Sequence, residues 1–204
     1  VGFRMRSSTK IATILAGVLL ALVSVFPRGD TQAQTQGVDM RLVPEAASIP
    51  SGGSIDLTIE VVPNGQQLSG IDICISFPAN FLQVVDAGLD TSGTQIQAVT
   101  TNLDVILQNN VDNQGGVIRY SAGKLSGSLP SSTFTLATIT MEAANVNTIA
   151  NVTFSETACP ASPNNVVLGE ATVLRDTFDS AITIGAVVQT VSSILCIYDT
   201  FYIF

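Results

Sequence analysis

Apolar and polar residues alternate in short runs along most of this chain. In the clearest run, residues 70–77, one face would carry Ile71, Ile73, Ile75 and Phe77, and the other Asp72, Cys74 and Ser76. A period of two is typical of a β-strand that buries one face. A shift of one residue would bury Asp72, so the pattern also fixes the register of this strand.

Runs of this kind recur between turn-forming clusters such as 63–65 and 112–116. Their number, about nine, and their spacing are typical of sandwiches and barrels. The parity of the apolar residues changes between Leu136 and Ile139, as it would at a β-bulge or a switch between sheets. No sustained 3.6-residue period follows Gly37, so we predict an all-β fold, an antiparallel β-sandwich of about nine strands.

The region 37–185 is acidic and has no histidine. It holds 14 acidic residues against 4 basic ones, which gives 4 − 14 = −10. Such a surface repels phosphate backbones, so nucleic acid is excluded as a partner. Without histidine, Ser-His-Asp and Cys-His nucleophiles, HExxH sites and Cys/His zinc sites are excluded as well.

Carboxylates are the remaining candidates for chemistry. A glycosidase pair would have to come from Asp72, Asp86, Asp104 and Asp112. Such a pair needs a concave pocket and a perturbed pKa, and short strands with short turns predict neither. The pairs Asp112 with Asn113 and Asp176 with Asp179 lack the spacing of a recognised calcium loop, and their turn-forming role explains them. We expect no enzyme, no catalytic residue, no metal site and no cofactor.

Residues 5–33 have the layout of a secretory signal peptide that starts at Met5. Basic residues precede an apolar stretch over 11–26, and small residues at 31–33 suit cleavage before Gln34. We therefore expect a secreted or cell-surface bacterial protein, with an uncleaved membrane anchor as the alternative. The tail 186–204 is apolar and is expected to lie outside the folded domain 37–185; whether it is native sequence, an anchor or a translation artefact is left open.

Export would permit disulfides. Cys74 and Cys159 both lie within 37–185, and Cys196 lies in the tail. A bridge between Cys74 and Cys159 is one candidate, but the sequence leaves open whether their Cα atoms are close enough.

Several segments match a known family in their order and spacing. They are Val43-Pro44 to Gly53, Leu68 to Asp72, Phe77 to Val85, Val111 to Gly123, Phe134 to Ile139 and Ala181 to Ile184. Across about residues 38–184 the chain resembles the cohesin-like family of extracellular modules, although Phe77 stands before Pro78 where the family commonly has Asp. The resemblance implies a nine-stranded sandwich of jelly-roll topology that binds a partner with one flat sheet face. In cellulosomal members that partner is a calcium-loaded dockerin module.

The resemblance also implies where such a face would lie. Its outward residues would be Asp72, Cys74, Ser76, Arg119 and Ser121, with Asn109 and Lys124 at the margin. The alternative interpretation is that these are ordinary solvated residues.

The predicted function is non-catalytic binding of a protein, dockerin-like in type. Membrane contact would come only through an uncleaved signal or the tail. A carbohydrate-binding module with a polysaccharide ligand is the alternative, because that architecture is shared. Sugar recognition on a sheet uses exposed aromatic platforms. The chain has no Trp, and most aromatic residues of the domain fall on predicted inward rows.

Overall fold

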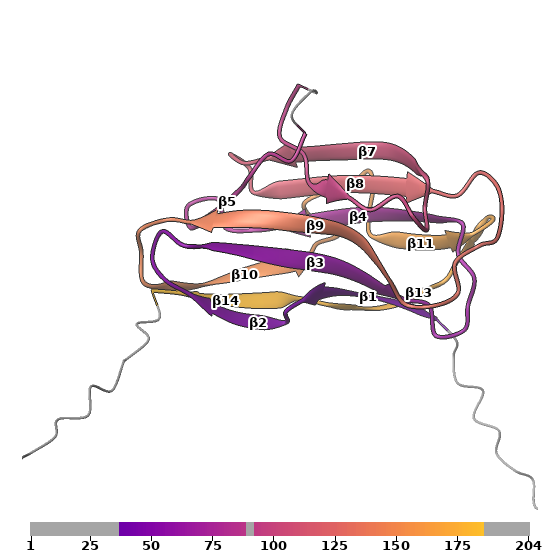
Figure 1. The fold of residues 1–204 in the computed structure, drawn as a ribbon, viewed down its shortest axis with the longest axis horizontal. Helices are drawn as coiled ribbons and strands as arrows, with labels where there is room; N and C mark the ends of the chain where they lie inside the picture. The colour runs from indigo at the N-terminus through magenta and orange to yellow at the C-terminus, as the bar shows by residue number, and fades with distance from the viewer. Residues whose placement is uncertain (1–36, 89–91, 186–204) are drawn as a thin grey trace, which may run out of the picture. The chain divides into compact units, whose positions relative to one another are not determined.

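The computed structural model describes residues 37–88 and 92–185, and all regular elements among them are β-strands. The predicted signal peptide 5–33, Cys196 and the tail 186–204 lie outside the described residues. The strands form two sheets that pack face to face (Figure 1). The predicted all-β sandwich is therefore confirmed. Within the described residues, no helix is long and apolar enough to cross a membrane.

The first sheet has the strand order β13-β1-β3-β9-β5, with β6 also paired to β9. The strands are β13 (Leu174–Phe178), β1 (Val38–Val43), β3 (Ser54–Val62), β9 (Phe134–Ala143), β5 (Leu82–Val84) and β6 (Gln97–Ala98). Ile59 pairs with Ala137 and Glu60 with Thr135, so Leu136 is an extra residue on β9. This β-bulge confirms the change of parity predicted there.

The second sheet has the order β12-β11-β4-β10-β14-β2, and β8 and β7 extend it beyond β4. The strands are β12 (Ala171–Thr172), β11 (Asn165–Leu168), β4 (Gly70–Ser76), β10 (Thr148–Phe154), β14 (Ser180–Ile184), β2 (Ala46–Ile49), β8 (Val117–Gly123) and β7 (Val105–Asp112). Strand β8 pairs with β4 along its full length. On the opposite edge, β11 pairs with 70–72 and β10 with 75–76.

Two pairings are parallel, β1 with β13 and β14 with β2. They arise where the chain crosses from the first sheet to the second between β1 and β2 and again between β13 and β14, because these two crossings run side by side. Ser180 Oγ, at the second crossing, donates a hydrogen bond to Pro44 O, at the first, at 2.7 Å. Because each crossing divides a long strand in two, and because β6 and β12 are short, the described residues contain 14 strands where the sequence indicated about nine.

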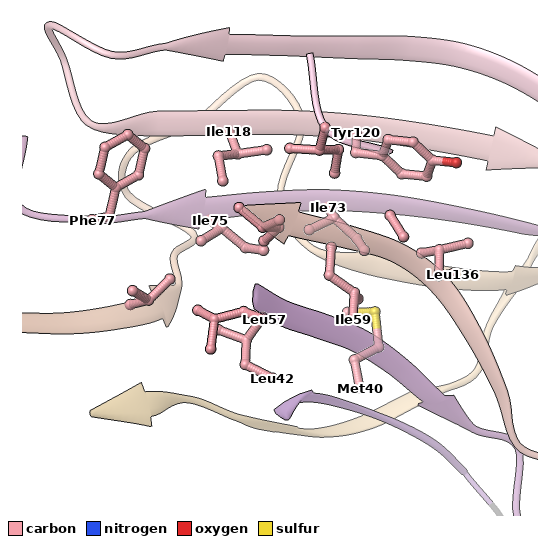
Figure 2. Close-up of a cluster of buried hydrophobic side chains, with 14 of the residues drawn as sticks. Met40, Leu42, Leu57, Ile59, Ile73, Ile75, Phe77, Ile118, Tyr120 and Leu136 are labelled. Atoms are coloured by element: carbon pink, nitrogen blue, oxygen red, sulfur yellow. The ribbon is translucent and has the colours of Figure 1, made fainter. Parts of the chain in front are cut away.

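The inward rows of both sheets meet in one apolar core. Figure 2 shows side chains of β1, β3 and β9 facing those of β4 and β8. Fully buried members include Met40, Leu42, Leu57, Ile59, Ile75, Ile118, Tyr120 and Leu136. Burying a side chain of this size stabilises a fold by about 1.5–3 kcal/mol relative to leaving it exposed. The alternation that predicts the strands is thus the pattern that fills the core.

An ion pair between a buried carboxylate and an exposed guanidinium attaches the parallel strand β13 to β1. Asp39 is 3% exposed, and its carboxylate accepts hydrogen bonds from Nε and Nη2 of Arg175. Asn64 Nδ2 donates a further bond to Asp39 at 3.1 Å. The hydrogen bonds from Arg175 to Asp39 raise the pKa of the guanidinium. A carboxylate removed from water needs such partners, so this strand is held by charge where its own residues bring little apolar area.

Tyr120 contributes an unusual polar group to the core. Its side chain is 0% exposed, and its hydroxyl has no hydrogen-bond partner among the described residues. Burial raises the pKa of this hydroxyl above its ordinary value of 10.0, because the phenolate would lose its hydration. A buried hydroxyl without a partner lowers stability relative to an apolar group of the same shape.

Tyr120→Phe is expected to raise the free energy of unfolding by about 1 kcal/mol, because it removes an unpaired buried polar atom. In the wild type, the stability that depends on a neutral Tyr120 is fully present below about pH 10 and is lost as the pH rises through the higher folded-state pKa. The variant should lack this alkaline loss. Urea unfolding at pH 7 and pH 11 measures both effects, and a variant less stable than the wild type at pH 7 would contradict the assignment.

Candidate functional site

Strands β7, β8, β4 and β11 lie next to one another in the second sheet (Figure 1). We call the outward surface of these four strands the outer face. Cross-strand pairing places Asp72 beside Ser121 and Asn165, and Arg119 beside Cys74 and Asn110. Four of the sequence-predicted residues, Asp72, Ser76, Arg119 and Ser121, are therefore brought together as the alternation predicts.

Hydrogen bonds fix the polar groups of the outer face. Ser121 Oγ donates to Asp72 Oδ1 at 2.5 Å, and Ser121 is only 6% exposed. Ser76 and Thr153 share a hydroxyl hydrogen bond of 2.9 Å. Asn165 Oδ1 is buried with no hydrogen-bond partner among the described residues. Ser121 thus orients Asp72, and the half-buried Asp72 is the member of the pair that a partner can reach.

The two basic residues predicted for the outer face differ in whether their charge is already paired within the protein. Lys124 forms an ion pair with Asp104 at 3.1 Å, and the hydrogen bond from Lys124 lowers the pKa of Asp104. Arg119 is half-buried, and its side chain makes no hydrogen bond or ion pair with another described residue. Its charge is therefore available to an acidic group or a carbonyl of a partner.

Asn109 does not belong to the outer face, so this prediction is wrong. It pairs with the inward-facing Tyr120, and its side-chain amide bonds both the N (3.0 Å) and the O (2.8 Å) of Ile96. The cause is a register shift in β7 between Ile106 and Gln108, which reverses the parity of the residues that follow. Asn110, opposite Arg119, takes the outward position instead.

Cys74 was predicted both as a face residue and as a disulfide candidate. Its side chain is in the outward row, but it is 0% exposed and offers a partner no contact, so its place among the binding residues is wrong. The structure contains a disulfide between Cys74 and Cys159, whose Cα atoms are 6.0 Å apart.

Exposed leucines at one end of the outer face were not predicted as site residues. Leu107 is 73% exposed and Leu125 is 82% exposed. With Val105, Val167 and the backbone around Gly123 they line a hollow of about 300 Å³. The sequence did contain a signal for Leu125, which is the one leucine in the polar turn 123–128. Burial in the core does not explain an apolar residue at such a position. Apolar groups gathered beside polar ones are typical of the centre of a protein interface.

The four carboxylates considered for catalysis are each engaged separately. Asp72 accepts from Ser121, Asp104 from Lys124, Asp86 from the amides of Gly88 and Gln95, and Asp112 from those of Gln114 and Gly115. No group of three or more His, Cys, Asp or Glu side chains suited to a metal occurs in residues 37–88 and 92–185. The described part of the chain therefore offers a partner a contact surface and separate hydrogen-bonding groups.

Aromatic side chains do not gather on the outer face. In the part of the chain that the structure describes, Phe178 is the only exposed aromatic residue, at 38%. It belongs to β13 of the first sheet, and the guanidinium of Arg41 lies 5.3 Å from its ring centre. The platform that a sugar ring would stack on is thus missing from the described part of this face.

No protein-family model and no curated protein matches the sequence. Solved structures do match the fold. A type II cohesin domain from the cellulosome of Acetivibrio cellulolyticus superposes with a TM-score of 0.58 at 15% identity, over 72% of this chain and 95% of that one. The third cohesin of ScaC from the same organism, in complex with the ScaB dockerin, gives 0.55 at 12% identity, over 72% and 98%. A non-cellulosomal cohesin from Archaeoglobus fulgidus gives 0.52 at 16% identity, over 72% and 91%. The chain therefore has the cohesin fold.

The disulfide should contribute measurably to stability. It closes a loop across a sequence separation of 85 residues, and the loss of chain entropy in the unfolded state corresponds to roughly 4.6 kcal/mol. We expect the double variant Cys74→Ser, Cys159→Ser to lower the free energy of unfolding by about 2–4 kcal/mol in urea titrations. Cys196→Ser, which leaves the bridge intact, is the matched control. Equal stability of the double variant and the wild type would show that the bridge does not form in solution.

Proposed function

From this cohesin fold, we propose that residues 37–185 form a secreted, non-catalytic module that docks a dockerin-like protein on the outer face. The observation that carries the proposal is the pair of exposed leucines beside a rigid polar sheet. Leu107 and Leu125 are the two most exposed of the large apolar side chains that the structure describes. A surface of this kind is suited to contact with another protein.

Rigidity makes the outer face suitable for docking. Strand β4 pairs with β8 over seven residues, and β8 pairs with β7 over nearly the same length. A partner therefore meets backbone that is already ordered, so binding orders few groups and loses less conformational entropy. Partners that meet a preformed sheet dock with little backbone movement.

The contact would have an apolar centre and polar surroundings. The hollow beside Leu107 and Leu125 has room for one apolar side chain of a partner, and its other lining residues are small or aliphatic except for Asp72 and Lys124. Asp72 and Arg119 offer an acceptor and a free cation on the neighbouring strands. Interfaces gain most of their affinity from a few buried apolar anchors, while the surrounding polar groups set orientation.

Similarity of fold supports the choice of partner. The structure of the third cohesin of ScaC holds a bound ScaB dockerin. Because this chain shares only the fold with that cohesin, a dockerin-like partner is an inference by analogy, and the leucines provide the separate physical argument.

The proposed setting is extracellular. The signal-peptide pattern of residues 5–33 predicts export. A disulfide between Cys74 and Cys159 fits an oxidising compartment, since such bonds are rare in reducing cytosol. The two observations are independent and favour the same location.

An array of calcium-loaded dockerin modules tests the proposal. It contains the dockerin modules encoded in the same genome as this chain and, separately, the ScaB dockerin of Acetivibrio cellulolyticus. We expect at least one to bind the wild type, and Leu107→Asp and Leu125→Asp to weaken that binding by about tenfold or more, since each places a charge in the apolar centre. Val85→Asp is the matched control, because Val85 is exposed and follows β5 in the first sheet.

Two outcomes would contradict the proposal. One is that none of the dockerin modules binds at a concentration of about 10 μM, a threshold that already admits weak complexes. The other is that both leucine variants bind as the wild type does. Affinity electrophoresis in soluble cellulose and xylan derivatives runs beside the array, and retardation there without dockerin binding would favour the polysaccharide alternative.

A further inference from the structure

Cys74 is anomalous for an outward-row residue of a sheet. Its row neighbours Asp72 and Ser76 are half-buried, whereas Cys74 is 0% exposed. Ile73 and Ile75, on either side of it in sequence, belong to the core, so the Cys74 side chain points away from the core. Something on the outer side of the sheet must therefore cover it. The disulfide identifies the cover as the part of the chain that contains Cys159.

Residues 155–164, which we call the tethered segment, leave the sheet and return to it at almost the same place. Phe154 pairs with Ile75 at the end of β10, and Asn165 pairs with Asp72 at the start of β11. Between these pairings, residues of the tethered segment form hydrogen bonds with the backbone N–H and C=O groups of Cys74. Ser155 N donates to Cys74 O at 2.8 Å, and Cys74 N donates to Asn164 Oδ1 at 2.8 Å.

The tethered segment is anchored at its middle as well as at its ends. Cys159 is 3% exposed and is bonded to Cys74, so it lies against the sheet. Ser162 N donates to Cys159 O at 3.0 Å, which closes a turn directly after the bridge. Glu156, Thr157 and Pro160 are exposed. The result is a raised, fixed feature on a sheet surface that would otherwise be flat.

The position of the tethered segment divides the outward surface of the second sheet. It emerges between the part of β4 that pairs with β11 and the part that pairs with β10. The leucine hollow is lined by Gly70, Asp72 and Val167, which belong to the β11 side. The exposed Ile149 and Asn151 belong to β10, on the other side. A partner seated in the hollow would therefore meet the tethered segment before it reached β10.

We propose that the tethered segment forms one wall of the docking surface and selects the partner. The inference rests on the proposed docking function and makes it more specific. The occupant is a dockerin-like module that fills the leucine hollow, covers β7 and β8, and presents a basic group to Glu156. A partner that lies flat across β4 and β10 would collide with the wall.

Charge supports the basic group on the partner. Residues 37–185 carry a net charge of 4 − 14 = −10, so a partner that approaches this domain is favoured by positive charge. Glu156 is the only charged residue of the tethered segment, and it is exposed. It makes no hydrogen bond or ion pair with another described residue, so it is free to meet a cation.

Charge reversal tests the wall directly. The probe is the calcium-loaded dockerin module that binds the wild type most tightly in the array. We expect Glu156→Lys to raise the Kd for this dockerin about fivefold or more and to make that Kd less dependent on salt concentration. Glu142→Lys is the matched control, because Glu142 is exposed on β9 of the first sheet. The control changes the net charge equally, so a general charge effect would move both variants alike.

Release of the tether provides a second measurement. The double variant Cys74→Ser, Cys159→Ser leaves the leucine hollow in place but frees the middle of the tethered segment. We expect its Kd for the same dockerin to rise about tenfold, because a tethered segment made mobile in this way must be ordered on binding. Circular dichroism at the assay temperature confirms that the variant is folded. If it is not folded, the two charge variants decide the question alone.

The outcomes separate the two proposals. If the wild type binds a dockerin, and Glu156→Lys binds like the wild type and like Glu142→Lys, the wall is overturned and the docking function stands. If the wild type binds no dockerin, both are overturned. Weaker binding by Glu156→Lys, with Glu142→Lys unchanged, supports the wall.

Discussion

Burial of two facing apolar rows is the constraint on which the rest of this structure depends. Strands β3 and β9 supply one row and β4 and β8 the other, and members such as Leu57 and Ile75 have no exposed surface. Because successive side chains in a strand point to opposite sides, fixing the inward rows also fixes the outward ones. The position of Asp72 and Arg119 on the outer face is therefore a consequence of core packing.

Local alternation predicted the parts of the fold that bury a row. The register of β4, the bulge at Leu136 and the outward position of Asp72 all follow from it. Strands β2 and β13 could not be predicted in this way, because Ala46–Ile49 and Leu174–Phe178 carry no alternating apolar row and are held by parallel pairing. That pairing depends on contacts between residues more than 130 positions apart in sequence, such as Ser180 with Pro44.

The candidate site was less predictable than the fold. A single register shift in β7, between Ile106 and Gln108, turned Asn109 toward the core side. The local sequence does not indicate where such a shift occurs. Cys74 was placed in the correct row, yet a segment 85 residues away covers it. The exposure of Leu107 and Leu125 depends on which neighbouring strands are absent, and that information is not local. Sequence alternation thus placed most of the outward row, and tertiary structure decided which of its residues are exposed.

These features together describe a surface that is rigid, apolar at one end and raised at its middle, on a domain that is acidic overall, which suits the proposed recognition of another protein. Amide chemical-shift mapping of the complex with the tightest-binding dockerin module measures most directly where that recognition occurs. The account predicts that the perturbed amides lie in residues 70–76, 105–125 and 155–164, with those of β3 and β9 unchanged. Perturbations concentrated on the outward residues of β3 and β9 would contradict it.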